Sequence, residues 1–138
     1  MKHHIENLTE KLLSRNIKPS YQRIKILEYL TDNCTHPTVD KIFCDLHKEI
    51  PTLSKTTIYN TLNLFLEANL VRVITIEDNE TRYDIDTTNH GHFKCQNCGE
   101  IYDFEADIEN IKVDGLNNFI INDKSLYFKG ICGKCQSA

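Results

Sequence analysis

The chain has 138 residues, which is enough for one domain of ordinary size or for two small ones. Hydrophobic residues make up 40% of the chain and charged residues 26%, and these globular proportions exclude an intrinsically disordered protein. The formal net charge of −4 excludes a protein that coats nucleic acid over its whole surface. The acidic excess lies in residues 76–138, so a DNA-binding function stays open for residues 1–75.

Four helices are expected in the first seventy residues, because apolar side chains recur there at helical spacing. They cover residues 4–15, about 21–32, a segment that starts after Thr38, and a segment that starts after Ser54 and runs to about residue 68. Two alternating segments, LVRVITI and TRYDI, flank the turn signal EDNE and indicate a β-hairpin. Helices followed by a hairpin are the ingredients of a winged helix-turn-helix domain, which we expect over residues 1–83.

The pattern changes to short strands from residue 92 onward. The segments HFKC and EIYDF indicate two strands, a helix is expected near residues 105–116, and SLYFKGIC indicates a last strand. Residues 84–138 are therefore expected to form a hinge and a small C-terminal α/β domain. The predicted fold class is α+β.

Four cysteines form two CxxC pairs, Cys95/Cys98 and Cys132/Cys135. Four thiolates are enough for a closed tetrahedral site, and thiolate sulfur favours Zn²⁺. Gly99 and Gly133 are expected to give each pair the conformational freedom that its turn needs. One structural zinc ion per chain would join the last strand to the first and stabilise a domain too small for a large core.

The cysteine usage also bears on location. In a reducing compartment, CxxC pairs are more often zinc ligands than disulfides. The N-terminal segment lacks the apolar core of a secretory signal, and no stretch approaches the roughly 18 apolar residues of a membrane span. We therefore expect a cytoplasmic protein without a membrane partner. Cys34 and Cys44 belong to no motif, and we expect them to be small buried residues.

The histidines near the first CxxC indicate a second metal site of different chemistry. His90 and His92 share a face of an extended segment, so both imidazoles can reach one ion. Two aspartates, Asp84 and Asp103, lie nearby in the chain or on the adjacent strand, and His36 precedes the third helix. Imidazole and carboxylate ligands suit Fe²⁺ or Mn²⁺. Hydrogen-bonded surface histidines would give the same spacing, so both interpretations stay open.

The fourth helix has a polar face suited to the major groove of DNA. Its apolar residues fall on one side, and the opposite side is small, polar and free of acidic residues until Glu67. We expect DNA contacts from Arg23 on the second helix and from five residues of the fourth helix, namely Lys55, Thr56, Thr57, Tyr59 and Asn60. A solvated polar surface would give the same pattern. The few basic residues favour a dimer, which doubles the contacts.

The segments YQRIKILEYL, HPTVDKIF, SKTTIYNTL and HGHFKCQNCGEIYDF, followed by the distal CxxC, resemble the ferric uptake regulator (Fur) family over nearly the whole chain. The resemblance implies a winged-helix DNA-binding domain, a C-terminal dimerisation domain and a homodimer. It also implies binding to a pseudo-palindromic double-stranded DNA operator when metal is bound at the hinge.

Within this family the sequence most resembles the peroxide-sensing branch. The resemblance carries the regulatory ligands over to this chain as one Fe²⁺ or Mn²⁺ site, made of His36, Asp84, His90, His92 and Asp103. Iron-uptake regulators usually have glutamates where Asp84 and Asp103 stand. The resemblance further implies that peroxide oxidises His36 or His90 in the iron-loaded protein, which releases DNA and derepresses peroxide-defence genes.

Three other functions compete with this hypothesis. An iron- or zinc-responsive repressor of metal-uptake genes would belong to the same family. A metalloenzyme, such as a hydrolase, is disfavoured because five protein ligands leave little open coordination for a substrate. A structural zinc protein that binds another protein would explain the cysteines but neither the histidines nor the polar helix face.

Overall fold

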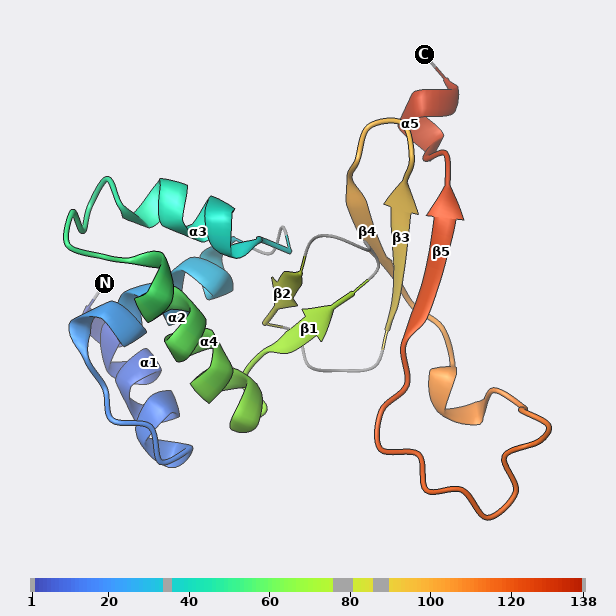
Figure 1. The fold of residues 1–138 in the computed structure, drawn as a ribbon, viewed down its shortest axis with the longest axis horizontal. Coiled ribbons are helices and arrows are strands. Elements are labelled where there is room, and N and C mark those ends of the chain that lie inside the picture. The colour runs from blue at the N-terminus through green and yellow to red at the C-terminus, as the bar shows by residue number, and fades with distance from the viewer. Residues whose placement is uncertain (1, 34–35, 76–80, 86–89, 138) are drawn as a thin grey trace. The chain divides into compact units, whose positions relative to one another are not determined.

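The computed structural model describes residues 2–33, 36–75, 81–85 and 90–137 (Figure 1). The chain divides into two compact units, the N-terminal unit Met1–Thr87 and the C-terminal unit Thr88–Ala138. The expected turn EDNE and Cys34 lie outside the described residues. Among the helices in the described ranges, none is long and apolar enough to cross a membrane.

The N-terminal unit begins with four helices, whose bounds are α1 Lys2–Ser14, α2 Tyr21–Asp32, α3 Val39–Leu46 and α4 Lys55–Glu67. The second, third and fourth begin at hydroxyl N-caps. The side-chain oxygens of Ser20, Thr38 and Ser54 each accept a hydrogen bond from the backbone N–H three residues later. Each cap satisfies a backbone donor that has no partner within the helix. The two caps expected from the sequence, Thr38 and Ser54, are confirmed.

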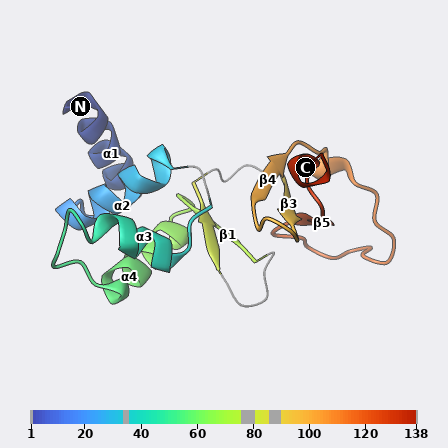
Figure 2. The same cartoon turned by 90° about the horizontal axis from the view of Figure 1, so that it is seen from above.

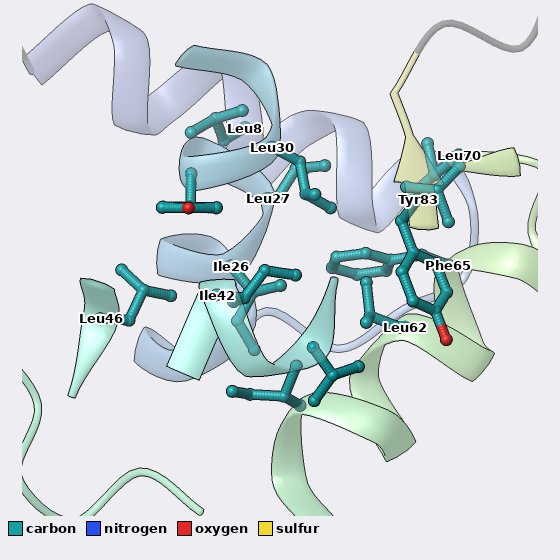
Figure 3. Packing of buried hydrophobic residues seen from close by; sticks show 14 of the residues in the cluster. Leu8, Ile26, Leu27, Leu30, Ile42, Leu46, Leu62, Phe65, Leu70 and Tyr83 are labelled. Carbon is teal, nitrogen blue, oxygen red and sulfur yellow. The ribbon is translucent and has the colours of Figure 1, made fainter. Parts of the chain in front are cut away.

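One hydrophobic core holds these helices together. Figure 3 shows side chains from all four helices, among them Leu8, Leu27, Ile42 and Phe65, that point toward one another. Phe65 of α4 is fully buried, as are Ile58 and Leu62 on the same face. Burial of one side of α4 leaves its opposite side exposed, as its apolar spacing predicts.

The hairpin predicted after α4 is present in the same unit. Strands β1 (Arg72–Ile74) and β2 (Arg82–Asp84) are antiparallel, with Val73 opposite Tyr83. The buried Tyr83 ring belongs to the helical core, and its backbone N–H donates to the Pro37 carbonyl at 3.0 Å. Strand β2 is thereby fixed beside the segment that precedes α3.

The C-terminal unit contains a three-stranded sheet in the order β4-β3-β5. Strand β3 (Gly91–Cys95) pairs antiparallel with β4 (Ile101–Phe104) and parallel with β5 (Leu126–Gly130). A short helix, α5 (Gly133–Gln136), follows the last strand. The three predicted strands are confirmed, and α5 was not expected.

The helix predicted near residues 105–116 is wrong. That segment contains a single 3₁₀ turn, Ile108–Asn110, and is otherwise irregular up to β5. Gly115 adopts a φ of 95° and Asn118 a φ of 67°, both in the left-handed region that ends helices. The β-branched Ile111 and Val113 also have low helix propensity. Apolar spacing alone could not outweigh these local preferences.

Candidate metal centres and nucleic-acid interface

The four cysteines of the C-terminal unit form one cluster, in which the sulfur atoms all lie within 4.8 Å of one another. The Sγ atoms of Cys95 and Cys135 are 3.7 Å apart, and those of Cys98 and Cys132 are 3.8 Å apart. Four sulfurs at the Zn–S distance of about 2.3 Å in a tetrahedron lie about 3.8 Å from each other. These two separations match that geometry, and the cluster is compact enough to hold a tetrahedral metal ion.

Two local turns bring these thiols together. Cys95 ends β3, and Gly99 closes the first turn with a φ of 80° and a hydrogen bond from its N–H to the Cys95 carbonyl. Cys132 follows β5 and is the N-cap of α5, which carries Cys135. Gly133 was expected to need similar freedom, but it has no positive φ because it simply starts α5. The parallel pairing of β3 with β5 sets the two turns side by side.

Hydrogen bonds favour the thiolate form of part of the cluster. The backbone N–H groups of Cys98 and Cys132 donate to Cys95 Sγ and lower the pKa of Cys95 to about 6. The Tyr102 side chain hydrogen-bonds to Cys132 and lowers the pKa of that thiol. A side-chain hydrogen bond with Asn97 lowers the pKa of Cys135, but neighbouring Cys132 opposes it and the pKa is raised to about 11. A cation among the sulfurs would favour deprotonation of all four thiols.

The N-terminal unit contains two of the five predicted regulatory metal ligands, one histidine and one aspartate. His36 and Asp84 are both buried, and His36 Nε2 lies 3.6 Å from Asp84 Oδ2. His36 adopts a φ of 56°, a strained conformation for a residue other than glycine. Arg82 donates to its carbonyl at 3.1 Å and holds this backbone in place. Strand β2 thus positions the carboxylate next to the histidine, although the two residues are 48 positions apart in the sequence.

The C-terminal unit contributes two histidines and one carboxylate. The rings of His90 and His92 lie 4.4 Å apart between centroids, and both are buried. Asp103 lies directly opposite His92 in the β3–β4 pairing, and its Oδ1 is 3.4 Å from His92 Nε2 and 3.6 Å from His90 Nε2. The expectation that the two histidines share a face of the strand is confirmed.

A glycine separates these two histidines, and the structure requires it. A Cβ atom at Gly91 would lie 2.2 Å from the ring of Phe104, the residue opposite it on β4. The Phe104 ring stacks on Phe128 of β5, with centroids 4.9 Å apart. Neither phenylalanine was singled out from the sequence, because only the strand register shows what lies over Gly91.

The α4 residues expected to contact DNA divide into two groups. Thr56, Tyr59 and Asn60 are exposed, as a recognition surface requires. Thr57 and Lys55 already have intramolecular partners. The Thr57 Oγ1 lies 2.9 Å from Ser54 Oγ, and Lys55 Nζ lies 3.0 Å from Asp40 Oδ1.

A basic depression of about 400 Å³ adjoins the exposed face of α4. Arg23, also expected to contact DNA, lines it and donates from Nη1 to the Lys18 carbonyl at 2.9 Å. Lys18 and Gln22 line the same depression. Neither residue was singled out from the sequence, because only the tertiary structure places them beside Arg23 and α4.

One cysteine differs from expectation. Cys44 is exposed on α3, because that helix buries Val39, Ile42 and Leu46 and the thiol lies off their common face. It takes part in neither metal cluster. His47, the C-cap of α3, is also exposed and stacks on Phe43.

The profile of the ferric uptake regulator family matches residues 14–129. The chain belongs to the ferric uptake regulator family. It is 34% identical over 140 residues to the peroxide-responsive repressor PerR of Staphylococcus aureus (strain Mu50), a match that covers 99% of this chain and 94% of that protein.

Solved structures from both branches of the family share this fold. The Vibrio cholerae ferric uptake regulator, in a crystal structure described as showing rearranged DNA-binding domains, matches with a TM-score of 0.74 and 26% identity, covering 90% of this chain and 98% of that one. PerR from Streptococcus pyogenes, in a structure concerned with peroxide sensing and gene regulation, matches with a TM-score of 0.55 and 30% identity, covering 96% and 92%.

These findings confirm the predicted family and fold class. The chain is a Fur-family, metal-responsive transcriptional repressor of α+β fold, with an N-terminal winged-helix DNA-binding domain and a C-terminal dimerisation domain. Proteins of this family are regulatory DNA-binding proteins rather than enzymes. The choice between peroxide sensing and metal-uptake control depends on the chemistry of the ligands.

Proposed function

We propose that this protein is a peroxide-responsive repressor, in which the metal state of the chain controls binding to a pseudo-palindromic DNA operator. The four-cysteine cluster holds one structural Zn²⁺ per chain. His36, Asp84, His90, His92 and Asp103 hold one regulatory Fe²⁺ or Mn²⁺ per chain. The observation that carries the proposal is the separation of donor types, with four thiols gathered in one cluster and imidazole paired with aspartate in each of the two units.

Each unit supplies part of the regulatory ligand set. The N-terminal unit offers the buried pair His36 and Asp84, and the C-terminal unit offers His90, His92 and Asp103. Binding of one ion by both sets would fix the DNA-binding unit with respect to the dimerisation unit. Loss of a ligand from either set would release that constraint, which gives the ion control over DNA binding.

The histidines are the residues that change during peroxide sensing. Ferrous iron held by these residues would supply the one-electron chemistry that cleaves the O–O bond of hydrogen peroxide. His36 or His90 would then exchange the hydrogen on its imidazole C2 carbon for an oxygen atom and become 2-oxo-histidine, a two-electron oxidation that is balanced by reduction of one hydrogen peroxide to water. A histidine that binds the iron would be next to the point where the oxidant forms, so it would react before the oxidant diffuses away. A modified imidazole is a poorer ligand, and the operator is released.

The test is mass spectrometry of the Fe²⁺-loaded full-length protein after substoichiometric hydrogen peroxide. We expect one added oxygen in the peptide that contains His36 or His90, together with loss of operator binding. The Mn²⁺-loaded protein is the matched control and should resist, because Mn²⁺ is much less able to carry out one-electron reduction of peroxide. Equal resistance of both forms, with unmodified histidines, would contradict peroxide sensing.

The DNA and homodimer parts of the proposal have their own support. The exposed Thr56, Tyr59 and Asn60 on α4 form a small polar face that suits the major groove. Large hydrophobic side chains, including Phe119 and Ile120, are exposed in the C-terminal unit, which is typical of a protein–protein interface. A homodimer would cover them and present two copies of α4 to a pseudo-palindromic operator.

A second candidate is an iron- or zinc-responsive repressor of metal-uptake genes. The likeness to the Vibrio cholerae ferric uptake regulator favours it. The two aspartates, Asp84 and Asp103, favour the peroxide-sensing branch instead. The peroxide experiment separates these candidates, because a repressor that senses metal supply would bind iron and DNA without acquiring oxygen.

A further inference from the structure

Lys55 begins the helix that faces DNA, yet its charge is already engaged by the preceding helix. Its Nζ lies 3.0 Å from Asp40 Oδ1 and 5.4 Å from the centroid of the Phe43 ring. Asp40 and Phe43 both belong to α3, which packs against α4 (Figure 2). The hydrogen bond with Asp40 raises the pKa of Lys55. Helix α3 therefore draws this ammonium toward itself by an ion pair and a cation–π contact.

Asp40 stands in an unfavourable place for a DNA-binding surface. The exposed side of α4 carries no acidic residue before Glu67, so Asp40 brings a carboxylate to the end of an otherwise acid-free face. A DNA phosphate that approaches the N-terminus of α4 would be attracted by Lys55 and by the helix dipole. The same phosphate would be repelled by Asp40.

The exposure of the pair shows that it can be displaced. The side chain of Asp40 is 78% exposed and that of Lys55 is 52% exposed. Ion pairs at such sites are weak and are screened by salt. The ammonium can therefore exchange its carboxylate partner for a phosphate without unfolding any element.

We infer that Asp40 competes with DNA phosphates for Lys55 and thereby lowers the affinity of the repressor for duplex DNA of any sequence. This inference rests on the proposed function only in taking α4 as the helix that faces DNA. Asp40 is a positioning residue, since it acts through Lys55 and not through DNA. This competition should increase the preference of the repressor for its operator over other DNA, because weaker phosphate contacts leave a larger share of the binding free energy to base contacts.

The test measures binding of the metal-loaded, full-length protein to a fluorescent duplex of scrambled sequence over a range of salt concentrations. Asp40→Asn should raise the association constant by roughly two- to five-fold, the range set by an exposed ion pair. It should also steepen the slope of log K against log salt by about 0.9 per chain, because one more phosphate contact is made. Asp40→Glu, which keeps the charge, should behave like the wild type.

A double-mutant cycle with Lys55→Ala separates competition from simple charge removal. In the Lys55→Ala background, Asp40→Asn should lose both the gain in affinity and the change in salt slope. Equal gains in the two backgrounds would overturn the inference, as would an unchanged salt slope in Asp40→Asn. If the metal-loaded wild type bound no duplex at all, the proposed repressor function itself would be overturned, so the two failures are distinguishable.

Discussion

The two units of the chain are stabilised in different ways. The N-terminal unit has a core built from four helices and a hairpin, with Leu12, Ile26, Leu62 and Phe65 fully buried. Among the described residues of the C-terminal unit, the buried apolar side chains are Cys95, Ile108 and Cys132. Two of those three belong to the sulfur cluster. A metal ion held by this cluster would thus take the place of a hydrophobic core where the chain is too short to build one.

The C-terminal unit also exposes many large hydrophobic side chains on its surface. In the C-terminal unit, large hydrophobic side chains are exposed between the 3₁₀ turn and the end of the chain, including Ile111, Val113, Phe119, Ile120 and Ile131. An open apolar depression of about 560 Å³, lined partly by Ile111 and Val113, lies among them. The C-terminal unit therefore buries few apolar side chains and exposes many, whereas the N-terminal unit buries most of its large apolar side chains in one core.

The largest expected effect is that of Cys95→Ser. A structural site supplies folding energy directly, on the order of 10 kcal/mol or more for zinc in small domains. We therefore expect this variant to lose its zinc and the protection of the C-terminal unit against hydrogen exchange, while the N-terminal unit stays protected. Zinc analysis and hydrogen-exchange mass spectrometry report both. Cys44→Ser, an exposed thiol outside the cluster, is the control and should match the wild type. Retained protection without zinc would show that the C-terminal unit has a core of its own.

The converse variant is Phe65→Ala in the N-terminal unit. Phe65 is fully buried at the centre of the helical core (Figure 3). Its truncation should lower the free energy of unfolding of that unit by about 3–5 kcal/mol. Chemical denaturation followed by circular dichroism measures the loss, and zinc content should remain that of the wild type. Loss of zinc in Phe65→Ala would show that the two units do not fold independently.

A smaller effect is expected from Gly91→Ala. The added Cβ would meet the Phe104 ring at 2.2 Å and push it from its stacking position on Phe128. We expect a cost of about 1–3 kcal/mol, the usual range for overpacking. Binding of Mn²⁺ should weaken, because His90 and His92 flank this residue, whereas the zinc should stay. Calorimetric titration with Mn²⁺ measures the change. Gly133→Ala is the matched control, since its Cβ would contact nothing within 4 Å.

The smallest effect concerns Tyr29→Phe. The Tyr29 hydroxyl donates to Asp45 Oδ2 at 2.6 Å, and this bond, with help from Lys41, lowers the pKa of Asp45 below its ordinary value of 3.8. A carboxyl with a lowered pKa contributes stability above its unfolded pKa and loses that contribution as pH falls through its folded pKa.

The stability gap between wild type and Tyr29→Phe should therefore be fully present at neutral pH and should shrink below about pH 4. Thermal unfolding followed over pH measures it. Zinc binding at neutral pH should be unchanged. A gap that grows on acidification would show that Asp45 does not titrate as this hydrogen bond requires.

Much of the secondary structure followed from local signals. The caps at Thr38 and Ser54, the apolar face of α4 and the alternating hairpin strands were correctly predicted, because each depends on residues within a few positions of one another. The helix expected near 105–116 failed, since residues such as Gly115 override a weak apolar period. The prediction that Cys44 is buried was wrong, because burial depends on which face of α3 meets the core.

The sequence by itself determined the donor types of the two candidate metal centres. Two CxxC pairs and an HxH pair are patterns of residues close together in the sequence. Sulfur ligands and imidazole or carboxylate ligands favour different metal ions, so the patterns indicate which kind of ion each centre can hold. Only the tertiary structure decided which distant residues meet these patterns. Strand register sets Asp103 opposite His92, and the position of β2 brings Asp84 to His36. Packing of α3 against α4 gives Lys55 its partner Asp40. Such pairings depend on long-range contacts, which the spacing of residues along the chain does not encode.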